Sequence, residues 1–265
     1  LPPVFADTVM VEQVLLNLVK NGIEAMAETP AEERVVIVSA LVGGLVGATV
    51  AKSGSGAPIV WEGFGKILAF IIISPLVGMI IGGLLMVLVS WIFRNHSPHQ
   101  AGKWFKSAQL FAAGAYSLAH GGNDAQKTIG IIWLLMITAG VATKDVATLP
   151  MWVIYSCYFA ISWGTYLGGW RIVKTMGTKI TKLNAVSGSC ASMGGAITLA
   201  MATFGGVPVS TTHTITGAII GVGSATDVKA VHWAITANLL VAWILTIPAS
   251  GLIAAIFWYI GTKSF

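Results

Sequence analysis

The sequence predicts an all-α, polytopic membrane protein preceded by a short segment of a different kind. Of the 265 residues, 55% are hydrophobic and only 9% are charged, whereas soluble domains carry about 25% charged residues. Residues 1–34 hold six acidic and two basic side chains, while residues 35–265 hold four acidic and thirteen basic ones. A charge-dense acidic head therefore precedes a long, charge-poor basic body, and the composition of the body argues against a soluble domain.

The body contains several apolar runs that reach or approach the length needed to cross a bilayer, which is about 20 residues. The predicted spans cover residues 35–51, 66–93, 107–120, 129–142, 150–168, 187–204, 209–223 and 231–260. Many of the 31 glycines lie inside these runs, and small residues let membrane helices approach closely. We therefore expect a multi-pass protein of the cell (inner) membrane, in contact with the lipid bilayer.

One of these runs is interrupted by the polar segment HGGNDAQKT at residues 120–128. Asp124 and Lys127 are costly at membrane depth unless they are paired or face a polar cavity. The adjacent Gly121 and Gly122 permit unwinding, and broken helices near the midplane form the binding sites of many secondary transporters. We expect a broken helix here; the alternative is a polar loop that joins two short helices at the membrane surface.

A second interruption, GGVPVSTTH, covers residues 205–213. Pro208 suits the start of a helix because it lacks an amide hydrogen. Ser210, Thr211 and Thr212 would then lie in the first turn, beside unpaired backbone N–H groups that suit an oxyanion such as phosphate. The alternative is an ordinary helix cap, for which one hydroxyl is sufficient.

The two polar segments resemble the paired signatures of the inorganic phosphate transporter (PiT) family. The signatures are HGGNDAQKTIG (120–130) and GGVPVSTTHTITGAIIGVG (205–223), and the similarity extends over about residues 39–260. The family consists of symporters that move inorganic phosphate, sometimes as a metal–phosphate complex, with Na⁺ or H⁺, and it is built from two inverted repeats. The resemblance implies a transporter rather than an enzyme, with no cofactor, no resident metal and no nucleic-acid partner. It also leaves room for a homodimer.

The resemblance assigns roles position by position. Phosphate binding is implied for Asn123, Ser210, Thr211 and Thr212. Asp124, together with Asn123, would bind the coupling cation or proton, since a carboxylate repels phosphate and an amide offers both donors and an acceptor.

Four further residues are accessory candidates: Lys127, Thr128, His120 and His213. Lys127 has two readings of equal weight, attraction of the anion and structural pairing with Asp124. The two histidines are candidate proton carriers, because an unperturbed imidazole titrates near pH 6.5. The alternative for each is a hydrogen-bonded packing residue.

The chain departs from the family pattern at several points. No second Asn-Asp motif precedes residue 120, and Ser39 stands where the family has His. Ser192 stands where relatives usually carry an acidic residue. We therefore expect an incomplete inverted-repeat phosphate transporter fold that begins inside the first repeat and that transports poorly by itself.

The acidic head resembles a different family. Residues 6–28 form an amphipathic pattern similar to the N-box helix of sensor histidine kinase ATPase domains, with Gln13, Asn17 and Asn21 matching its polar positions. The glycine-rich nucleotide-binding segments of that fold do not accompany it. We expect two parts, a head over residues 1–38 (a fusion or a gene-model artefact) and a transporter-like domain over residues 39–265. The alternative functions are a nucleotide-binding kinase fragment, a passive anion channel and an inactive membrane scaffold.

Overall fold

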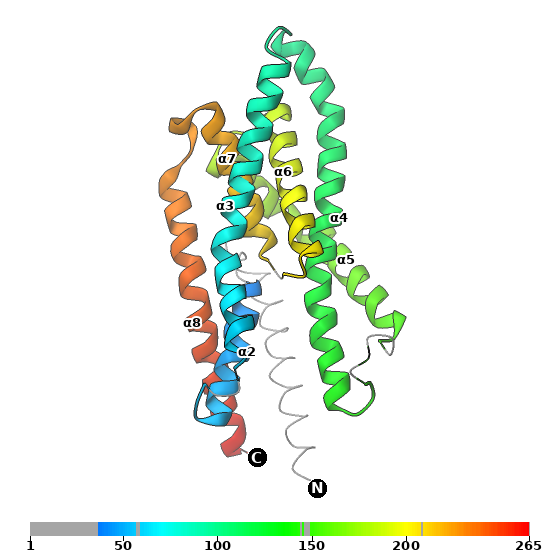
Figure 1. Cartoon of the computed structure of the whole chain (residues 1–265), viewed down its shortest axis with the longest axis vertical. Coiled ribbons are helices and arrows are strands. Elements are labelled where there is room, and N and C mark those ends of the chain that lie inside the picture. Colours follow the sequence, from blue (N-terminus) through cyan, green and yellow to red (C-terminus); the bar gives the residue numbers. More distant parts are fainter. Residues whose placement is uncertain (1–36, 57–58, 144, 146–148, 208, 265) are drawn as a thin grey trace. The chain divides into compact units, whose positions relative to one another are not determined.

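The computed structural model describes residues 37–264, apart from residues 57–58, 144, 146–148 and 208. Every regular element in these residues is helical, as the sequence predicted (Figure 1). The α-helices are α2 (Ile37–Ser53), α3 (Trp61–Ile92), α4 (Pro98–Thr138), α5 (Met151–Thr175), α6 (Ala185–Phe204), α7 (Thr211–Thr226) and α8 (Trp233–Ser264). A π-helical turn η3 (Met176–Ile180) follows α5, and a 3₁₀ turn η4 (Val228–Ala230) follows α7.

Three of these helices are long and apolar enough to cross a membrane: Trp61–Ile92, Ala185–Phe204 and Trp233–Thr262. The apolar stretches of α3 and α8 are mostly exposed, and their large aliphatic and aromatic side chains face outward. In α6, by contrast, most of the apolar stretch is buried. Lipid is the solvent in which such an apolar exterior is stable, so the helices confirm the expectation of a polytopic membrane protein.

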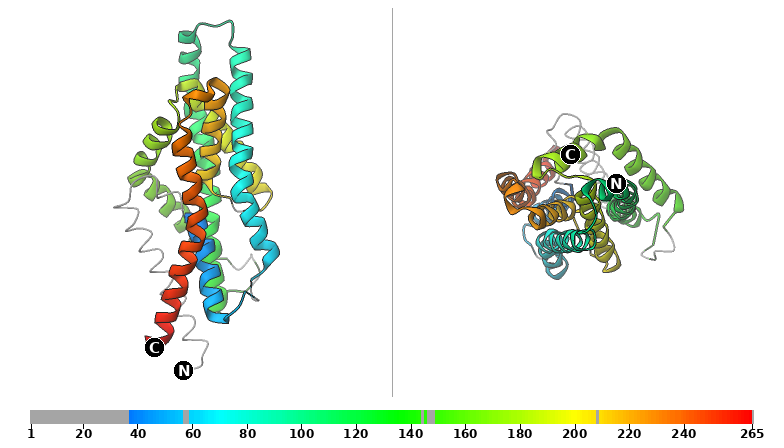
Figure 2. Two further views of the ribbon diagram at one scale, coloured as in Figure 1. Left: turned by 90° about the vertical axis from the view of Figure 1, so that its left-hand side faces the viewer. Right: turned by 90° about the horizontal axis from the view of Figure 1, so that it is seen from above.

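The chain divides into two compact units, and the candidate site lies in the larger one. This unit contains Glu62–Lys127 and Ser156–Ala237. Its centre is the packing of α7 against α3 and α6, which run beside it in both views of the ribbon (Figures 1 and 2).

Small residues make this close packing possible. A methyl group on Gly217 or Gly221 of α7 would collide with the backbone of α3 at Pro75 or Met79. A side chain on Gly194 of α6 would likewise come within 2.9 Å of the α-carbon of Gly82. Close backbone approach of this kind is the usual basis of helix association in lipid.

The second unit contains the described parts of Leu1–Trp61, Thr128–Tyr155 and Asn238–Phe265. Here α2 packs on α8 through glycines: a side chain on Gly43 would collide with the backbone of Ile247, and one on Gly47 with the backbone of Gly251. The glycine clusters in the apolar runs thus mark helix contacts in both units.

The prediction of a broken helix at residues 120–128 is wrong, and so is the alternative of a surface loop. α4 runs from Pro98 to Thr138 without interruption and includes the whole segment. Neither Gly121 nor Gly122 adopts a positive φ. The polar side chains are accommodated instead by contacts that they make from one face of the intact helix, as described below.

The second predicted break is present. α6 ends at Phe204 and α7 begins at Thr211, with a short connection between them. Pro208, which the prediction used as the helix start, lies outside the described residues, and so does nearly all of the acidic head with its N-box resemblance. The division at residue 38 therefore stays a prediction.

Candidate functional site

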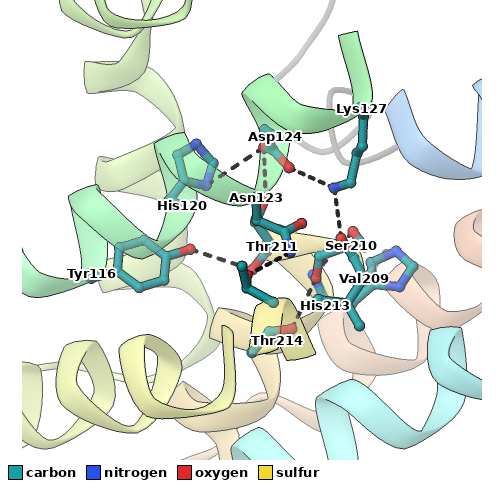
Figure 3. Close-up of polar contacts among 11 residues, drawn as sticks. Tyr116, His120, Asn123, Asp124, Lys127, Val209, Ser210, Thr211, His213 and Thr214 are labelled. Atoms are coloured by element: carbon teal, nitrogen blue, oxygen red, sulfur yellow. Dashed lines mark hydrogen bonds and ion pairs between the residues drawn. The ribbon is translucent and has the colours of Figure 1, made fainter. Parts of the chain in front are cut away.

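One face of α4 carries the polar residues of the site. Tyr116, His120, Asn123, Asp124 and Lys127 follow one another at intervals of three or four residues or as direct neighbours, so an intact helix places them along one stripe. Figure 3 shows their side chains gathered beside the start of α7. The stripe is continuous only because α4 is not broken at residues 120–128.

The connection between α6 and α7 brings a helix start to the same place. After α6 the N–H of Gly206 donates to the carbonyl of Thr203, at 3.1 Å, and the N–H of Val207 donates to that of Ala202, at 3.0 Å. These two bonds form a Schellman motif, which requires a left-handed residue at its turn. Gly206 supplies it with a φ of +65°. The Schellman motif therefore ends α6 and redirects the chain toward the start of α7.

Ser210 caps α7, as an N-cap serine does. Its hydroxyl accepts from the N–H of His213, at 3.4 Å, and its carbonyl accepts from the hydroxyl of Thr214, at 3.0 Å. The N–H groups of Thr211 and Thr212 occupy the first turn, where a helix offers no carbonyl partner. A helix N-terminus with such amides carries a partial positive charge that favours an anion.

Asp124 joins the two elements. One of its carboxylate oxygens accepts from the ammonium of Lys127, at 2.6 Å, and the other accepts from the hydroxyl of Thr211, at 3.0 Å. The Nδ1 atom of His120 lies 3.7 Å from the second oxygen. Asp124 is about one-quarter exposed, so its charge is balanced mainly by the neighbouring ammonium.

Lys127 extends this network to the backbone before α7. Its ammonium also donates to the carbonyl of Val209, at 2.7 Å. Of the two readings of Lys127 from the sequence, the structure shows the pairing with Asp124 (Figure 3). The pair carries no net charge, so the carboxylate does not repel an anion as strongly as it would alone.

Asn123 turns toward the end of α6. Its amide nitrogen donates to the hydroxyl of Thr203, at 3.2 Å, and its amide oxygen is buried without a hydrogen-bond partner among the described residues. An unsatisfied buried acceptor is unusual and points to a ligand or a water molecule at that position. An open pocket of about 200 Å³ lies here, lined by Asn123, Gln126, Lys127, Thr203, Gly206 and Val207.

Three of the predicted residues are not part of this network. Thr212 is half-buried, and Thr128 is exposed and falls in the other compact unit. His213 is fully buried and lies against the backbone of Ile71 in α3, in keeping with its alternative reading as a packing residue.

Two side chains of the network escaped the sequence analysis. Tyr116 donates its hydroxyl to the carbonyl of Thr211, at 3.3 Å, and its ring stacks on that of His120. Thr203 holds Asn123 from the last turn of α6. The signal for Tyr116 was its helical spacing from His120 and Asp124, which the assumption of a break at residue 120 concealed. The signal for Thr203 was weaker: it is a hydroxyl residue that lies two positions before the glycine pair of the break.

Apolar helices that enclose a carboxylate, an ammonium and a hydroxyl-rich helix start define a polytopic membrane protein with a polar site among its helices. Residues 34–254 match the Phosphate transporter family, and the chain belongs to that family. This membership confirms the resemblance that the two polar segments indicated.

Similar proteins occur in several bacteria. A "Probable low-affinity inorganic phosphate transporter" of Rhizobium meliloti (strain 1021) is 51% identical over 220 residues, which are 83% of this chain and 65% of that protein. A protein of the same description from Bacillus subtilis (strain 168) is 39% identical over 221 residues, or 83% of this chain and 66% of that protein. The chain thus spans slightly less than two-thirds of the length of these relatives.

The fold is also similar to a solved structure. "The sodium-dependent phosphate transporter" matches with a TM-score of 0.56 and 24% identity, over 85% of this chain and 64% of that one. Together with the membrane-length helices, these comparisons confirm an all-α, multi-pass inner-membrane protein of a family whose members are described as transporters rather than enzymes. The inverted repeat stays a prediction.

Proposed function

We propose that this chain moves inorganic phosphate across the membrane by symport with a cation or a proton, through the pocket beside Asn123 and Lys127. The proposal rests on one contact: the hydroxyl of Thr211, the first residue of α7, donates a hydrogen bond to the carboxylate of Asp124. Family membership supports phosphate as the substrate, as do relatives described as inorganic phosphate transporters.

Phosphate would be held by donors, because all its exposed oxygens are acceptors. The pocket offers the ammonium of Lys127 and the amide of Asn123, and the first turn of α7 offers the N–H groups of Thr211 and Thr212. The hydroxyls of Ser210 and Thr211 are already engaged in the network. They would reach phosphate by exchanging their present hydrogen bonds, whereas the hydroxyl of Thr212 would contribute directly.

Coupling would occur at Asp124, with Asn123 as a second ligand. A carboxylate at this depth is stable only when a positive charge or a proton neutralises it, and its neutralisation permits a phosphate anion to enter. The Nδ1 atom of His120 lies 3.7 Å from the carboxylate, so proton exchange between the two groups would need a closer approach or a bridging water molecule. A metal–phosphate complex as cargo, a homodimer and the absence of a cofactor are parts of the same proposal that rest on the family resemblance.

Uptake of labelled phosphate into proteoliposomes tests the proposal. With a Na⁺ or proton gradient imposed, we expect the purified chain to accumulate phosphate above its external concentration, relative to protein-free liposomes, but at the low rate that the sequence predicts. Flux that only follows the phosphate gradient would contradict symport and support the passive channel. No flux together with no phosphate binding would support an inactive scaffold.

A further inference from the structure

The ammonium of Lys127 is bound to two oxygens of a small group that we call the oxygen cage, which consists of the Asp124 carboxylate, the Val209 carbonyl and the Thr211 hydroxyl. It donates to a carboxylate oxygen of Asp124, at 2.6 Å, and to the backbone carbonyl of Val209, at 2.7 Å. The hydroxyl of Thr211 is attached to the other carboxylate oxygen, at 3.0 Å. Carboxylates, unwound backbone carbonyls and hydroxyls are the ligands with which transporters hold small cations. This cage therefore has the composition of a cation site, and a side chain of the same protein fills it.

The lysine is fixed in that place by the geometry of both elements. Lys127 lies one turn after Asp124 on the same face of α4, so the helix itself brings the two groups together. Val209 lies in the short connection before α7, where its carbonyl is outside both helices and available as an acceptor. Only 13% of the lysine side chain is exposed, which limits exchange of the ammonium with solvent.

We infer that Lys127 is a built-in cation that takes the place of a sodium ion beside Asp124, so that phosphate passage at this site does not require Na⁺. The inference deepens the proposed function by excluding Na⁺ from the coupling step at Asp124, and it rests on that function for the identity of the substrate. Asp124 carries one negative charge and Lys127 one positive charge, and His120 is a further basic group 3.7 Å from the carboxylate. A sodium ion would add a positive charge to a pair that is already neutral and would have to displace the ammonium from both oxygens.

Removing the ammonium should expose the cage. In Lys127→Met the carboxylate and the Val209 carbonyl lose their donor, and a sodium ion gains a vacant site with an unbalanced negative charge. The matched control is Lys103→Met, which removes an exposed lysine from the first turns of the same helix.

Thermal unfolding of the purified 265-residue chain in detergent provides the measurement, with NaCl exchanged for choline chloride at constant ionic strength. We expect the midpoints of the wild type and of Lys103→Met to be the same in both salts. We expect Na⁺ to raise the midpoint of Lys127→Met by about 3–5 °C at ten times its Kd, as mass action predicts for a chain of this size. A sodium-dependent rise in the wild type would overturn the inference, and so would a folded Lys127→Met that does not respond.

Binding of ²²Na⁺ to the wild type and to Asp124→Asn decides the matter if Lys127→Met does not fold. Binding to the wild type that disappears in Asp124→Asn overturns the inference, and equal binding to both supports it. Phosphate binding is measured on the same samples. A wild type that ignores Na⁺ and also fails to bind phosphate would contradict the proposed function while leaving the assignment of Lys127 intact.

Discussion

Residues 120–128 and residues 205–210 look alike in sequence, yet they fold differently. Both place a glycine pair within a few residues of polar side chains inside an apolar run, and both were expected to interrupt a helix. The first remains helical within α4, whereas the second separates α6 from α7. The comparison shows that a polar segment at membrane depth does not need a break when its side chains find partners.

The partners differ in kind between the two segments. In α4 the ammonium of Lys127 pairs with the carboxylate of Asp124 one turn away, and the backbone stays helical throughout the segment. Between α6 and α7 the backbone itself changes direction at Gly206, whose left-handed conformation closes the Schellman motif. The intact helix supplies the charges of the site, and the break supplies the free amides.

The largest effect is expected from Asp124→Asn. This substitution removes the one acidic side chain of α4. The ammonium of Lys127 then loses its counter-charge, although the amide oxygen of Asn can still accept from it, and the coupling carboxylate is gone. We expect gradient-driven phosphate accumulation in proteoliposomes to fall to the level of empty liposomes, with membrane insertion retained. Glu62→Gln is the matched control, because that carboxylate pairs with Lys66 at an exposed position. Its accumulation should equal that of the wild type.

Thr211→Val tests the contact between the two segments. The substitution removes the hydroxyl that donates to Asp124, and a hydrogen bond to a charged group contributes about 1.5–3 kcal/mol. We expect thermal unfolding in detergent to show a loss of stability of this size. Thr226→Val, at the far end of α7, removes a hydroxyl bonded only to the carbonyl of Val222 in its own helix and should cost less. Equal losses in the two variants would argue against the contact.

Substituting a glycine in each segment should change the stability of the protein in opposite directions. Gly206→Ala forces a side chain into a left-handed conformation and should destabilise the protein by about 1–2 kcal/mol. Gly122→Ala places a methyl group in open space within a helix, so it should stabilise the protein by up to about 1 kcal/mol. Unfolding midpoints of the two variants give the comparison. Destabilisation by both would indicate that α4 is not a regular helix at residue 122.

The smallest effect is expected from Tyr116→Phe. The change removes the hydroxyl that donates to the carbonyl of Thr211 but keeps the ring that stacks on His120. A neutral hydrogen bond of this kind contributes about 0.5–1.5 kcal/mol. We expect a stability loss within that range by thermal unfolding, and no loss at all would remove Tyr116 from the network.

The positions of α6 and α7 were predictable from the sequence because each coincides with an apolar run bounded by polar or glycine-rich residues. The expected spans 187–204 and 209–223 correspond closely to α6 and α7. The pairing of Asp124 with Lys127 was also within reach, since it depends on spacing along one helix. The resemblance to the family predicted Asp124 and Thr211 as members of one site, and the structure shows a hydrogen bond between them; their roles in binding stay a prediction.

The contacts between α4 and α7 were not predictable from local pattern. Lys127 reaches a carbonyl 82 residues later, and Asp124 reaches a hydroxyl 87 residues later. Such partners depend on how the helices pack, through the glycines of α3, α6 and α7. Without them the polar residues of α4 appeared unsatisfied, and a break was the natural but incorrect inference.

Chemical protection tests most directly whether phosphate occupies the pocket that α4 forms with the end of α6 and the connection to α7. Gln126 is exposed and lines this pocket, and Ser107 is an exposed residue elsewhere on α4. Each is replaced by Cys in a protein whose buried Cys157 and Cys190 have been changed to Ala, and modification by a small thiol reagent is timed. We predict that phosphate slows the modification of Gln126→Cys and leaves that of Ser107→Cys unchanged. Equal rates for Gln126→Cys with and without saturating phosphate would contradict occupation of this pocket by phosphate.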